Sequence, residues 1–270
     1  MEILRTAECF PLNPEEPVFT IVVFSHNEQI SIGRADGRCA SKTDNDLGEL
    51  QDVVKLDKTE FQPRYSDEYT RTKPINESFV KRPNLFSYYP VNDTNKKRIA
   101  DEILQEVQVF ERLRRHPHPN IAKYLGCEVT DGKISGIFFK QYKQSLQQRL
   151  NPGHLNKREF ARWACLDEAW CSRIIEGIES GLDHLHALGF VHNDITPSNI
   201  MLDEGDTPIF IDFESCRAIG ESLEGVGRTY EWYDHEIQTA GPSNDLDALA
   251  EMEAWMFGKV DDFKFAEMTI

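Results

Sequence analysis

The chain has 270 residues and a net charge of −16, because 46 acidic side chains outnumber 30 basic ones. This excess argues against a nucleic-acid-binding protein, since neutralising phosphates requires clusters of lysine and arginine. No apolar run approaches the roughly 18 residues needed to cross a bilayer, and the first residues lack the layout of a signal peptide, so we expect neither a nucleic acid nor a membrane as a partner.

Six cysteines occur without any C-x-x-C spacing. That spacing is typical of metal sites and redox-active pairs, which the sequence therefore does not indicate. The pattern predicts reduced thiols and a cytoplasmic protein, with a nuclear location left open. Nothing in the sequence indicates an oligomeric state.

The region before residue 78 allows two interpretations. Apolar residues over Val18–Phe24 and Gln29–Ile32 flank a polar turn, which predicts a hairpin. The charged stretch Ala35–Asn76 would then be an insertion, partly disordered. Alternatively, the first strands of the domain lie within Asp52–Arg71 and the early hairpin is an extension.

A strand and a helix follow, and each carries one notable charge. Ser78–Lys81 predicts a short strand that ends in a lysine. Arg98–Arg115 has the apolar spacing of an amphipathic helix, and Glu106 falls on the apolar face. A carboxylate on an inward face is costly unless a cation meets it, so we expect an ion pair between Lys81 and Glu106. The apolar positions of this helix are Ile99, Ile103, Leu104, Val107, Phe110 and Leu113.

The middle of the chain predicts a strand, a connector and two helices. Ile134–Phe139 is an apolar run typical of a buried strand, and the polar connector Lys140–Ser145 separates it from a helical segment at Leu146–Leu150. Cys171–Leu188 has apolar residues at helical spacing throughout, which indicates a long helix with a buried face.

A loop and a hairpin then bring three polar residues together. Asp194 and Asn199 lie in one loop, and Asp212 comes thirteen residues after Asn199. Apolar runs at 200–202 and 209–211 flank the polar turn at 203–206, which predicts a hairpin that returns Asn199 and Asp212 to the same end. A carboxylate that orients an acceptor, an amide and a second carboxylate that bind Mg²⁺ are the residue types that phosphoryl transfer needs.

These motifs resemble those of the protein kinase superfamily. Residues 192–199 have the form H-x-D-x-x-x-x-N, and residues 211–214 read I-D-F-E, which is similar to the D-F-G metal-binding motif. Residues 116–126 are similar to the H-P-N-I-x-x-x-x-G turn that follows the helix in protein kinases. Over Ser78–Phe257 the pattern is similar to compact fungal protein-kinase-like proteins.

The resemblance implies an α+β fold of two lobes. The N-terminal lobe would hold an antiparallel sheet and one helix, and the mostly helical C-terminal lobe would be truncated after its buried central helix. The corresponding boundaries are an N-terminal extension with the first strands, partly disordered, at 1–77, the N-terminal lobe at 78–139, a hinge at 140–145 and the short C-terminal lobe at 146–270.

The resemblance also implies an ATP and Mg²⁺ site. Lys81, held by Glu106, would contact the nucleotide phosphates, and Asp194 would orient the acceptor hydroxyl. Asn199 and Asp212 would bind the metal ion. The remaining nucleotide contacts would come from the hinge at Gln141 and Tyr142. Asp245 resembles a buried aspartate that holds the loop backbone, and it also has the position of a helix N-cap, as do Asn244 and Ser243.

Several departures from the kinase pattern stand out. No G-x-G-x-x-G loop precedes Lys81, which puts the binding of the nucleotide phosphates in question. Asn193 replaces the usual arginine, which argues against regulation through a phosphorylated activation segment. Thr196 replaces a lysine found in many serine/threonine kinases. Glu214 replaces glycine, as either a further metal contact or a solvated residue. Glu236 has no later arginine to pair with.

Three functions remain open from the sequence. The first is a serine/threonine protein kinase that acts on a protein substrate. The second is a pseudokinase, a nucleotide-binding or scaffold module, which the absent glycine loop favours and the intact charged positions oppose. The third is a small-molecule kinase, because the same motifs also resemble choline-kinase-like and aminoglycoside-phosphotransferase-like enzymes.

Overall fold

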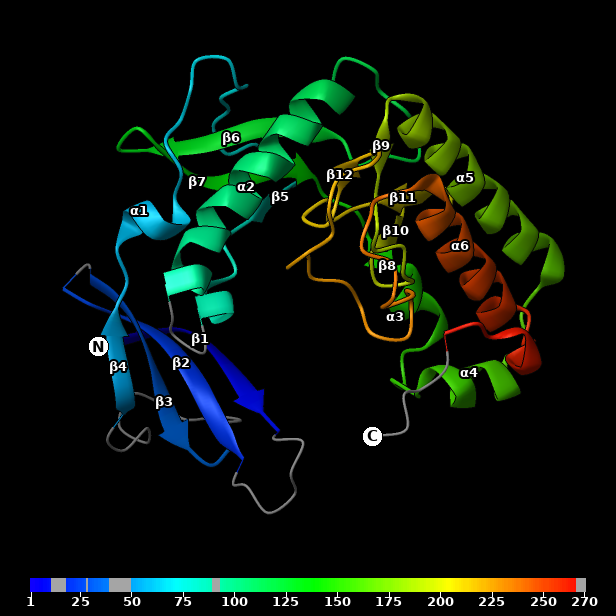
Figure 1. Cartoon of the computed structure of the whole chain (residues 1–270), viewed down its shortest axis with the longest axis horizontal. Coiled ribbons are helices and arrows are strands. Elements are labelled where there is room, and N and C mark those ends of the chain that lie inside the picture. Colours follow the sequence, from blue (N-terminus) through cyan, green and yellow to red (C-terminus); the bar gives the residue numbers. More distant parts are fainter. Residues whose placement is uncertain (11–17, 28, 39–49, 89–92, 266–270) are drawn as a thin grey trace. The chain divides into compact units, whose positions relative to one another are not determined.

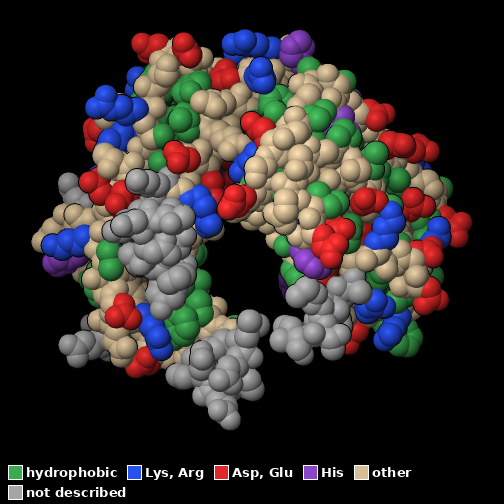
Figure 2. All heavy atoms as spheres, viewed as in Figure 1, with side chains coloured by type: hydrophobic (Ala, Val, Ile, Leu, Met, Phe, Trp, Pro, Cys, Tyr) green, Lys and Arg blue, Asp and Glu red, His purple; other side chains and the backbone are tan. Residues whose placement is uncertain are grey.

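The computed structural model describes residues 1–10, 18–27, 29–38, 50–88 and 93–265. Contacts divide the chain into two compact units. The first unit contains residues 1–73, 80–107 and 126–137, and the second contains residues 74–79, 108–125 and 138–270. On the face shown in Figure 2, acidic side chains are interspersed with basic ones on both units.

A four-stranded antiparallel sheet opens the first unit (Figure 1). Its order along the sheet is the order in the chain: β1 (Glu2–Cys9), β2 (Phe19–His26), β3 (Gln29–Asp36) and β4 (Gln51–Lys55). Strands β2 and β3 form the hairpin predicted from the sequence, and the short helix α1 (Lys58–Phe61) follows β4. The prediction of disorder within 35–76 falls partly on residues 39–49, which lie outside the described residues.

The boundary between the units passes through a second sheet and a long helix. The sheet has the order β5 (Ser78–Lys81), β7 (Lys133–Lys140), β6 (Tyr124–Thr130). A short 3₁₀ turn, η1 (Leu85–Tyr88), separates β5 from helix α2 (Asp93–Leu113), which begins five residues before the predicted start. Its apolar positions Ile99, Ile103, Val107, Phe110 and Leu113 are buried, as an amphipathic helix requires.

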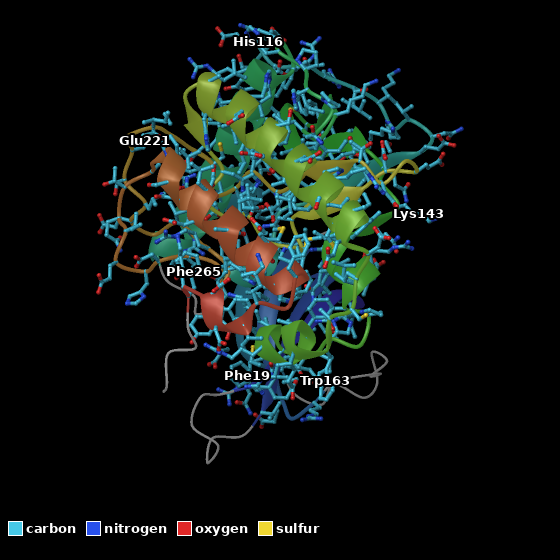
Figure 3. The ribbon with its side chains drawn as sticks, turned by 90° about the vertical axis from the view of Figure 1, so that its right-hand side faces the viewer. Phe19, His116, Lys143, Trp163, Glu221 and Phe265 are labelled. Atoms are coloured by element: carbon cyan, nitrogen blue, oxygen red, sulfur yellow. The ribbon has the colours of Figure 1, made fainter. Side chains whose placement is uncertain are left out.

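Among the described residues, the helices that lie wholly within the second unit are α3 (Leu146–Leu150), α4 (Lys157–Trp163), α5 (Glu168–Ala187) and α6 (Pro242–Met256). Helices α5 and α6 lie side by side, and α4 packs near one end of α6 (Figures 1 and 3). Helix α5 also approaches a strand closely, because a Cβ on Gly181 would lie 2.9 Å from the Phe210 ring. Only glycine permits this contact without displacing the ring.

Short strands complete the second unit. They are β8 (Gln144–Ser145), β9 (Phe190–Val191), β10 (Ile200–Leu202), β11 (Pro208–Phe210) and β12 (Arg217–Ala218), paired in the orders β11-β10-β8 and β12-β9. Irregular chain connects β12 to α6, and the 3₁₀ turn η2 (Val260–Asp262) follows α6. The α+β class agrees with the sequence, but the expectation of a mostly helical C-terminal part is not confirmed.

A buried ion pair joins α4 to α6 in the second unit. The Lys157 ammonium of α4 lies 2.5 Å from a Glu251 carboxylate oxygen of α6 and 2.5 Å from the Glu231 carbonyl oxygen. The rings of Trp232 and Phe263 lie 4.6 and 4.8 Å from the same nitrogen. Burial lowers the pKa of Lys157, and the Glu251 carboxylate opposes that effect.

None of the helices in the described part of the chain combines the length and apolar character required to cross a bilayer.

Candidate functional site

The ion pair predicted between Lys81 and Glu106 is present in the first unit. The Lys81 ammonium, at the end of β5, lies 2.9 Å from the Glu106 carboxylate on α2. The glutamate side chain is only 1% exposed, whereas the lysine side chain is 20% exposed. A buried carboxylate is stable here because a cation meets it, and the lysine still reaches solvent.

In the second unit, Asp245 anchors the loop that follows β9. Its carboxylate is fully buried and accepts hydrogen bonds from the backbone N–H groups of His192 and Asn193, at 2.8 and 2.7 Å. The His186 ring nitrogen lies 2.8 Å from the same carboxylate. Asp245 therefore holds the backbone of the loop, as the resemblance implied. The alternative of a helix N-cap at Asp245, Asn244 or Ser243 is wrong, because the N-cap of α6 is Gly241.

Asn193 connects the loop to two other segments. Its side-chain amide donates to the Ser215 carbonyl at 3.1 Å, and its side-chain oxygen accepts a hydrogen bond from Asn244 at 3.0 Å. The residue is buried and adopts a φ of 64°, in the left-handed region that asparagine tolerates better than most residues. The uncharged amide of Asn193 thus links the loop to Ser215 and to Asn244.

The Asp194 carboxylate is oriented by two neighbours. Asn199 donates its side-chain amide to one carboxylate oxygen at 2.7 Å. Thr229 donates its backbone N–H at 2.7 Å and its hydroxyl at 3.1 Å. The sequence analysis did not identify Thr229, because 35 residues separate it from Asp194 and no local pattern marks the contact.

The predicted hairpin places Asn199 and Asp212 at one end of β10 and β11. The Ile211 N–H donates to the Asn199 carbonyl at 3.0 Å, and Asp212 is the next residue. Asp212 has a φ of 61°, in the left-handed region that aspartate, like asparagine, tolerates better than most residues. The neighbouring Phe213 is fully buried, with its ring 4.8 Å from the His192 ring.

The donor set at this end suits Mg²⁺. Asn199 directs its amide nitrogen at Asp194, so its side-chain oxygen remains as a possible metal ligand, and the Asp212 carboxylate is a second one. Mg²⁺ prefers oxygen ligands and is usually held by one or two carboxylates together with substrate phosphates and water. No cluster of three or more His, Cys, Asp or Glu that could hold a metal ion occurs among the described residues.

The connector predicted as a hinge makes contacts of its own. The Gln141 N–H donates to the Glu77 carbonyl at 3.1 Å. The Tyr142 hydroxyl accepts a hydrogen bond from the Lys123 N–H at 3.0 Å, and burial raises the pKa of Tyr142. The Gln141 N–H, which we expected to contact the nucleotide, is therefore already hydrogen-bonded within the chain.

The residues that depart from the kinase pattern have different environments. Thr196 is buried, and its hydroxyl and carbonyl oxygens both accept from the Asn199 N–H, so it shapes the turn. Glu214 is half-buried, and Glu236 is exposed. An exposed Glu236 needs no buried arginine to compensate its charge.

A family model described as Protein kinase domain matches residues 88–245, more than half of the chain. The match includes Glu106, Asp194, Asn199 and Asp212 but begins after Lys81.

Curated relatives match somewhat more than half of the chain. Serine/threonine-protein kinase SSK22 of Saccharomyces cerevisiae is 30% identical over 148 residues, which cover 54% of this chain and 10% of the yeast protein. MAP kinase kinase kinase SSK2 of the same yeast is 27% identical, with 58% and 10% covered. Receptor-like serine/threonine-protein kinase SD1-7 of Arabidopsis thaliana is 31% identical, with 58% and 18% covered. The matches thus span less than a fifth of the length of these relatives.

Proposed function

Because this chain belongs to the protein kinase family, we propose that it transfers the γ-phosphate of ATP to a serine or threonine hydroxyl of a protein in an Mg²⁺-dependent reaction. The observation that carries this proposal is the arrangement of Asp194, Asn199 and Asp212 at one end of the loop and hairpin. Serine/threonine kinases among the relatives support the class of acceptor.

Each residue has a separate role in the proposed reaction. Asp194 accepts a hydrogen bond from the acceptor hydroxyl and later receives its proton. Asn199 and Asp212 hold Mg²⁺, which when bound neutralises charge on the nucleotide phosphates. Lys81 donates to the α- and β-phosphates, and Glu106 fixes the position of its ammonium.

The contacts of Asp194 support its role. Thr229 and Asn199 supply three hydrogen-bond donors to the Asp194 carboxylate. The same donors fix the direction of the carboxylate, so the acceptor meets an oriented base. Thr196 supplies no cation near the transferred phosphate. One missing charge-assisted hydrogen bond costs about 1.5–3 kcal/mol, or roughly tenfold to a hundredfold in rate, so we propose a slow enzyme.

The proposal also covers the domain boundaries and the cellular location. We assign residues 1–77 to the N-terminal extension and first strands, 78–139 to the N-terminal lobe, 140–145 to the hinge and 146–270 to the C-terminal lobe. The five cysteines among the described residues are free thiols, which supports a cytoplasmic location.

The test combines nucleotide binding with turnover. Asp194→Asn should retain the stabilisation by ATP and Mg²⁺, because the acceptor contact matters only during transfer, while phosphotransfer falls by about a hundredfold or more. Asp212→Asn should lose the Mg²⁺-dependent part of that stabilisation. Thermal-shift titrations and a radiolabel transfer assay measure both effects. Asp183→Asn, an exposed carboxylate on α5, is the matched control.

One observation favours a second candidate function, a pseudokinase that serves as a binding or scaffold module. The Gln141 N–H is already paired with the Glu77 carbonyl, so adenine has to displace this contact to use it. Stabilisation by ATP without transfer to any acceptor would establish the second function. Stabilisation with transfer that Asp194→Asn abolishes would establish the first.

A further inference from the structure

A series of contacts connects the buried ammonium of Lys157 to the candidate site. The ammonium donates to the Glu231 carbonyl at 2.5 Å and lies 4.6 Å from the centre of the Trp232 ring. The Trp232 N–H donates to the Thr229 carbonyl at 3.2 Å. Thr229 in turn donates its N–H and its hydroxyl to the Asp194 carboxylate. All these contacts lie within the second unit.

The segment that carries Thr229 is held on both sides. Before Thr229, the Ser215 hydroxyl donates to the Gly227 carbonyl at 2.5 Å. After Thr229, the Glu231 carbonyl accepts from the Lys157 ammonium. Glu231 has a φ of 68°, in the left-handed region that is uncommon for glutamate. A residue keeps such a conformation when its surroundings fix it, and the hydrogen bond from Lys157 is one contact that does so.

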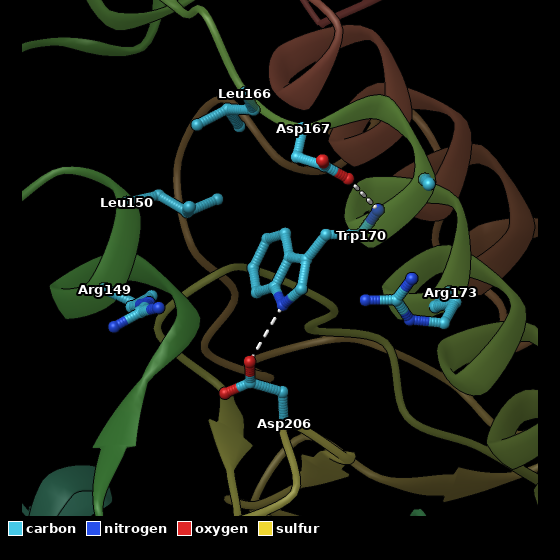
Figure 4. A pocket seen from close by; sticks show the side chains of 8 residues that line it. Arg149, Leu150, Leu166, Asp167, Trp170, Arg173 and Asp206 are labelled. Atoms are coloured by element: carbon cyan, nitrogen blue, oxygen red, sulfur yellow. Dashed lines mark hydrogen bonds between the residues drawn. The ribbon is translucent and has the colours of Figure 1, made fainter.

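Helix α4, which carries Lys157, is a fixed support for this contact. The Phe160 ring of α4 stacks on the Trp255 ring of α6, with ring centres 4.2 Å apart. The chain that follows α4 is secured at the start of α5, where the Trp170 indole N–H donates to the Asp206 carboxylate at 2.9 Å (Figure 4). An ammonium on a helix held in this way can fix the backbone that it contacts.

We propose that Lys157 is a positioning residue for phosphotransfer: it holds the segment around Thr229, which keeps the Asp194 carboxylate directed at the acceptor hydroxyl. This inference rests on the proposed function. The Lys157 side chain is only 5% exposed, so it acts through the segment and not on the nucleotide or the acceptor. Glu236, which lies later in the same segment, is exposed, so its carboxylate provides no buried anchor.

Hydrogen exchange tests the contact without requiring catalysis. The double variant Lys157→Met with Glu251→Leu removes the ammonium and leaves no unpaired buried carboxylate, so the second unit should stay folded. The N–H groups of Thr229 and Trp232 should exchange about tenfold faster or more, because one charge-assisted hydrogen bond that opposes opening of the segment is lost. The His192 N–H, which the buried carboxylate of α6 holds, corrects for any loss of overall stability.

Phosphotransfer to a degenerate peptide library with one fixed serine or threonine tests the positioning role. The same double variant should lower kcat by about tenfold, because misplacing a catalytic group by about 1 Å can cost up to a hundredfold. The KM for ATP should stay as in the parent, since the nucleotide contacts are unchanged. Lys259→Met with Glu253→Leu, which removes an exposed lysine–glutamate pair at the end of α6, is the matched control.

The exchange and transfer measurements can each overturn the proposal. Unchanged exchange at Thr229 and Trp232, or an equal acceleration at these groups and at the His192 N–H, would show that Lys157 does not hold the segment. Faster exchange with an unchanged kcat would show that the segment does not orient the base. A parent protein that transfers phosphate to no acceptor would refute the proposed function and the positioning role with it, while the exchange rates would still decide whether Lys157 holds the segment.

Discussion

Two lysine–glutamate pairs, one in each unit, differ in what surrounds the ammonium group. Lys81 meets Glu106 at 2.9 Å and keeps 20% of its side chain exposed. Lys157 meets Glu251 at 2.5 Å with 5% exposed, and a carbonyl oxygen and two aromatic rings occupy its other sides. Both glutamates are buried, so the difference lies in the lysines.

This difference separates a binding role from a structural one. A lysine that keeps contact with solvent can exchange water for a phosphate oxygen, whereas an enclosed lysine has no surface left for a ligand. We therefore infer that the Lys157 pair connects α4 to α6, and that the Lys81 pair serves the nucleotide. Distance alone would not distinguish the two pairs.

The largest expected effect comes from breaking the enclosed pair. Lys157→Met leaves the Glu251 carboxylate buried without its cation, which should lower the free energy of unfolding by about 3–5 kcal/mol. All four tryptophans belong to the second unit, so urea unfolding followed by tryptophan fluorescence measures this unit directly. A loss below about 1 kcal/mol would show that water reaches the pair.

The double variant Lys157→Met with Glu251→Leu is the control for this measurement. Replacing both partners removes the unpaired charge, and apolar side chains of similar volume often restore stability. Most of the loss should therefore be recovered. A double variant as unstable as the single one would attribute the effect to packing.

Breaking the Lys81–Glu106 pair should reduce activity, and the buried Glu106 left without its cation should destabilise the first unit rather than the second. Lys81→Met should reduce phosphotransfer by roughly tenfold to a hundredfold, because one charge-assisted hydrogen bond to the nucleotide is lost. The stabilisation by ATP should fall in a thermal-shift titration, while the tryptophan-detected unfolding of the second unit stays unchanged. Lys58→Met, an exposed lysine of the first unit, should leave all three readings as in the parent.

A third ionisable group, the half-buried His118, sharpens the comparison and gives the smallest effect. Burial, and then the nearby His184, lower the pKa of His118. Between that lowered value and the ordinary value of about 6.5, the unfolded chain binds more protons than the folded one. The contribution of His118 to stability is therefore fully present above pH 6.5 and is lost as the pH falls through the folded-state pKa.

His118→Asn should remove this acid-side loss and keep an acceptor for the Asn120 N–H, which the ring nitrogen accepts at 3.3 Å in the parent. Urea unfolding of both proteins across pH 5–8 measures the difference. Parallel pH curves would mean that another group titrates.

Features with a local cause were predictable from the sequence. The apolar spacing of α2 and α5 and the hairpin of β10 and β11 follow from residues close together in the chain. The Lys81–Glu106 pair was predictable for a related reason, because a carboxylate on an apolar helix face demands a cation. Strand β1 was missed, since its half-exposed pairing with β2 leaves only a weak apolar pattern.

Features that depend on distant residues were not predictable. The Thr229–Asp194 contact spans 35 residues and the Lys157–Glu251 pair spans 94, so neither leaves a periodic pattern in the sequence. The pairing of the Gln141 N–H depends on the conformation of Glu77, which has a φ of 60° that its residue type does not favour. Such contacts arise from tertiary packing and become visible only in three dimensions.

The fully buried Asp245 carboxylate has a consequence for hydrogen exchange. Loop amides normally exchange quickly with solvent, but the N–H groups of His192 and Asn193 donate to a group that is 0% exposed. These two protons can leave only when α6 separates from the loop, which requires opening of the core of the second unit. Two positions in an irregular segment should therefore exchange as slowly as the centre of a helix, and their exchange rates report how often this unit opens as a whole.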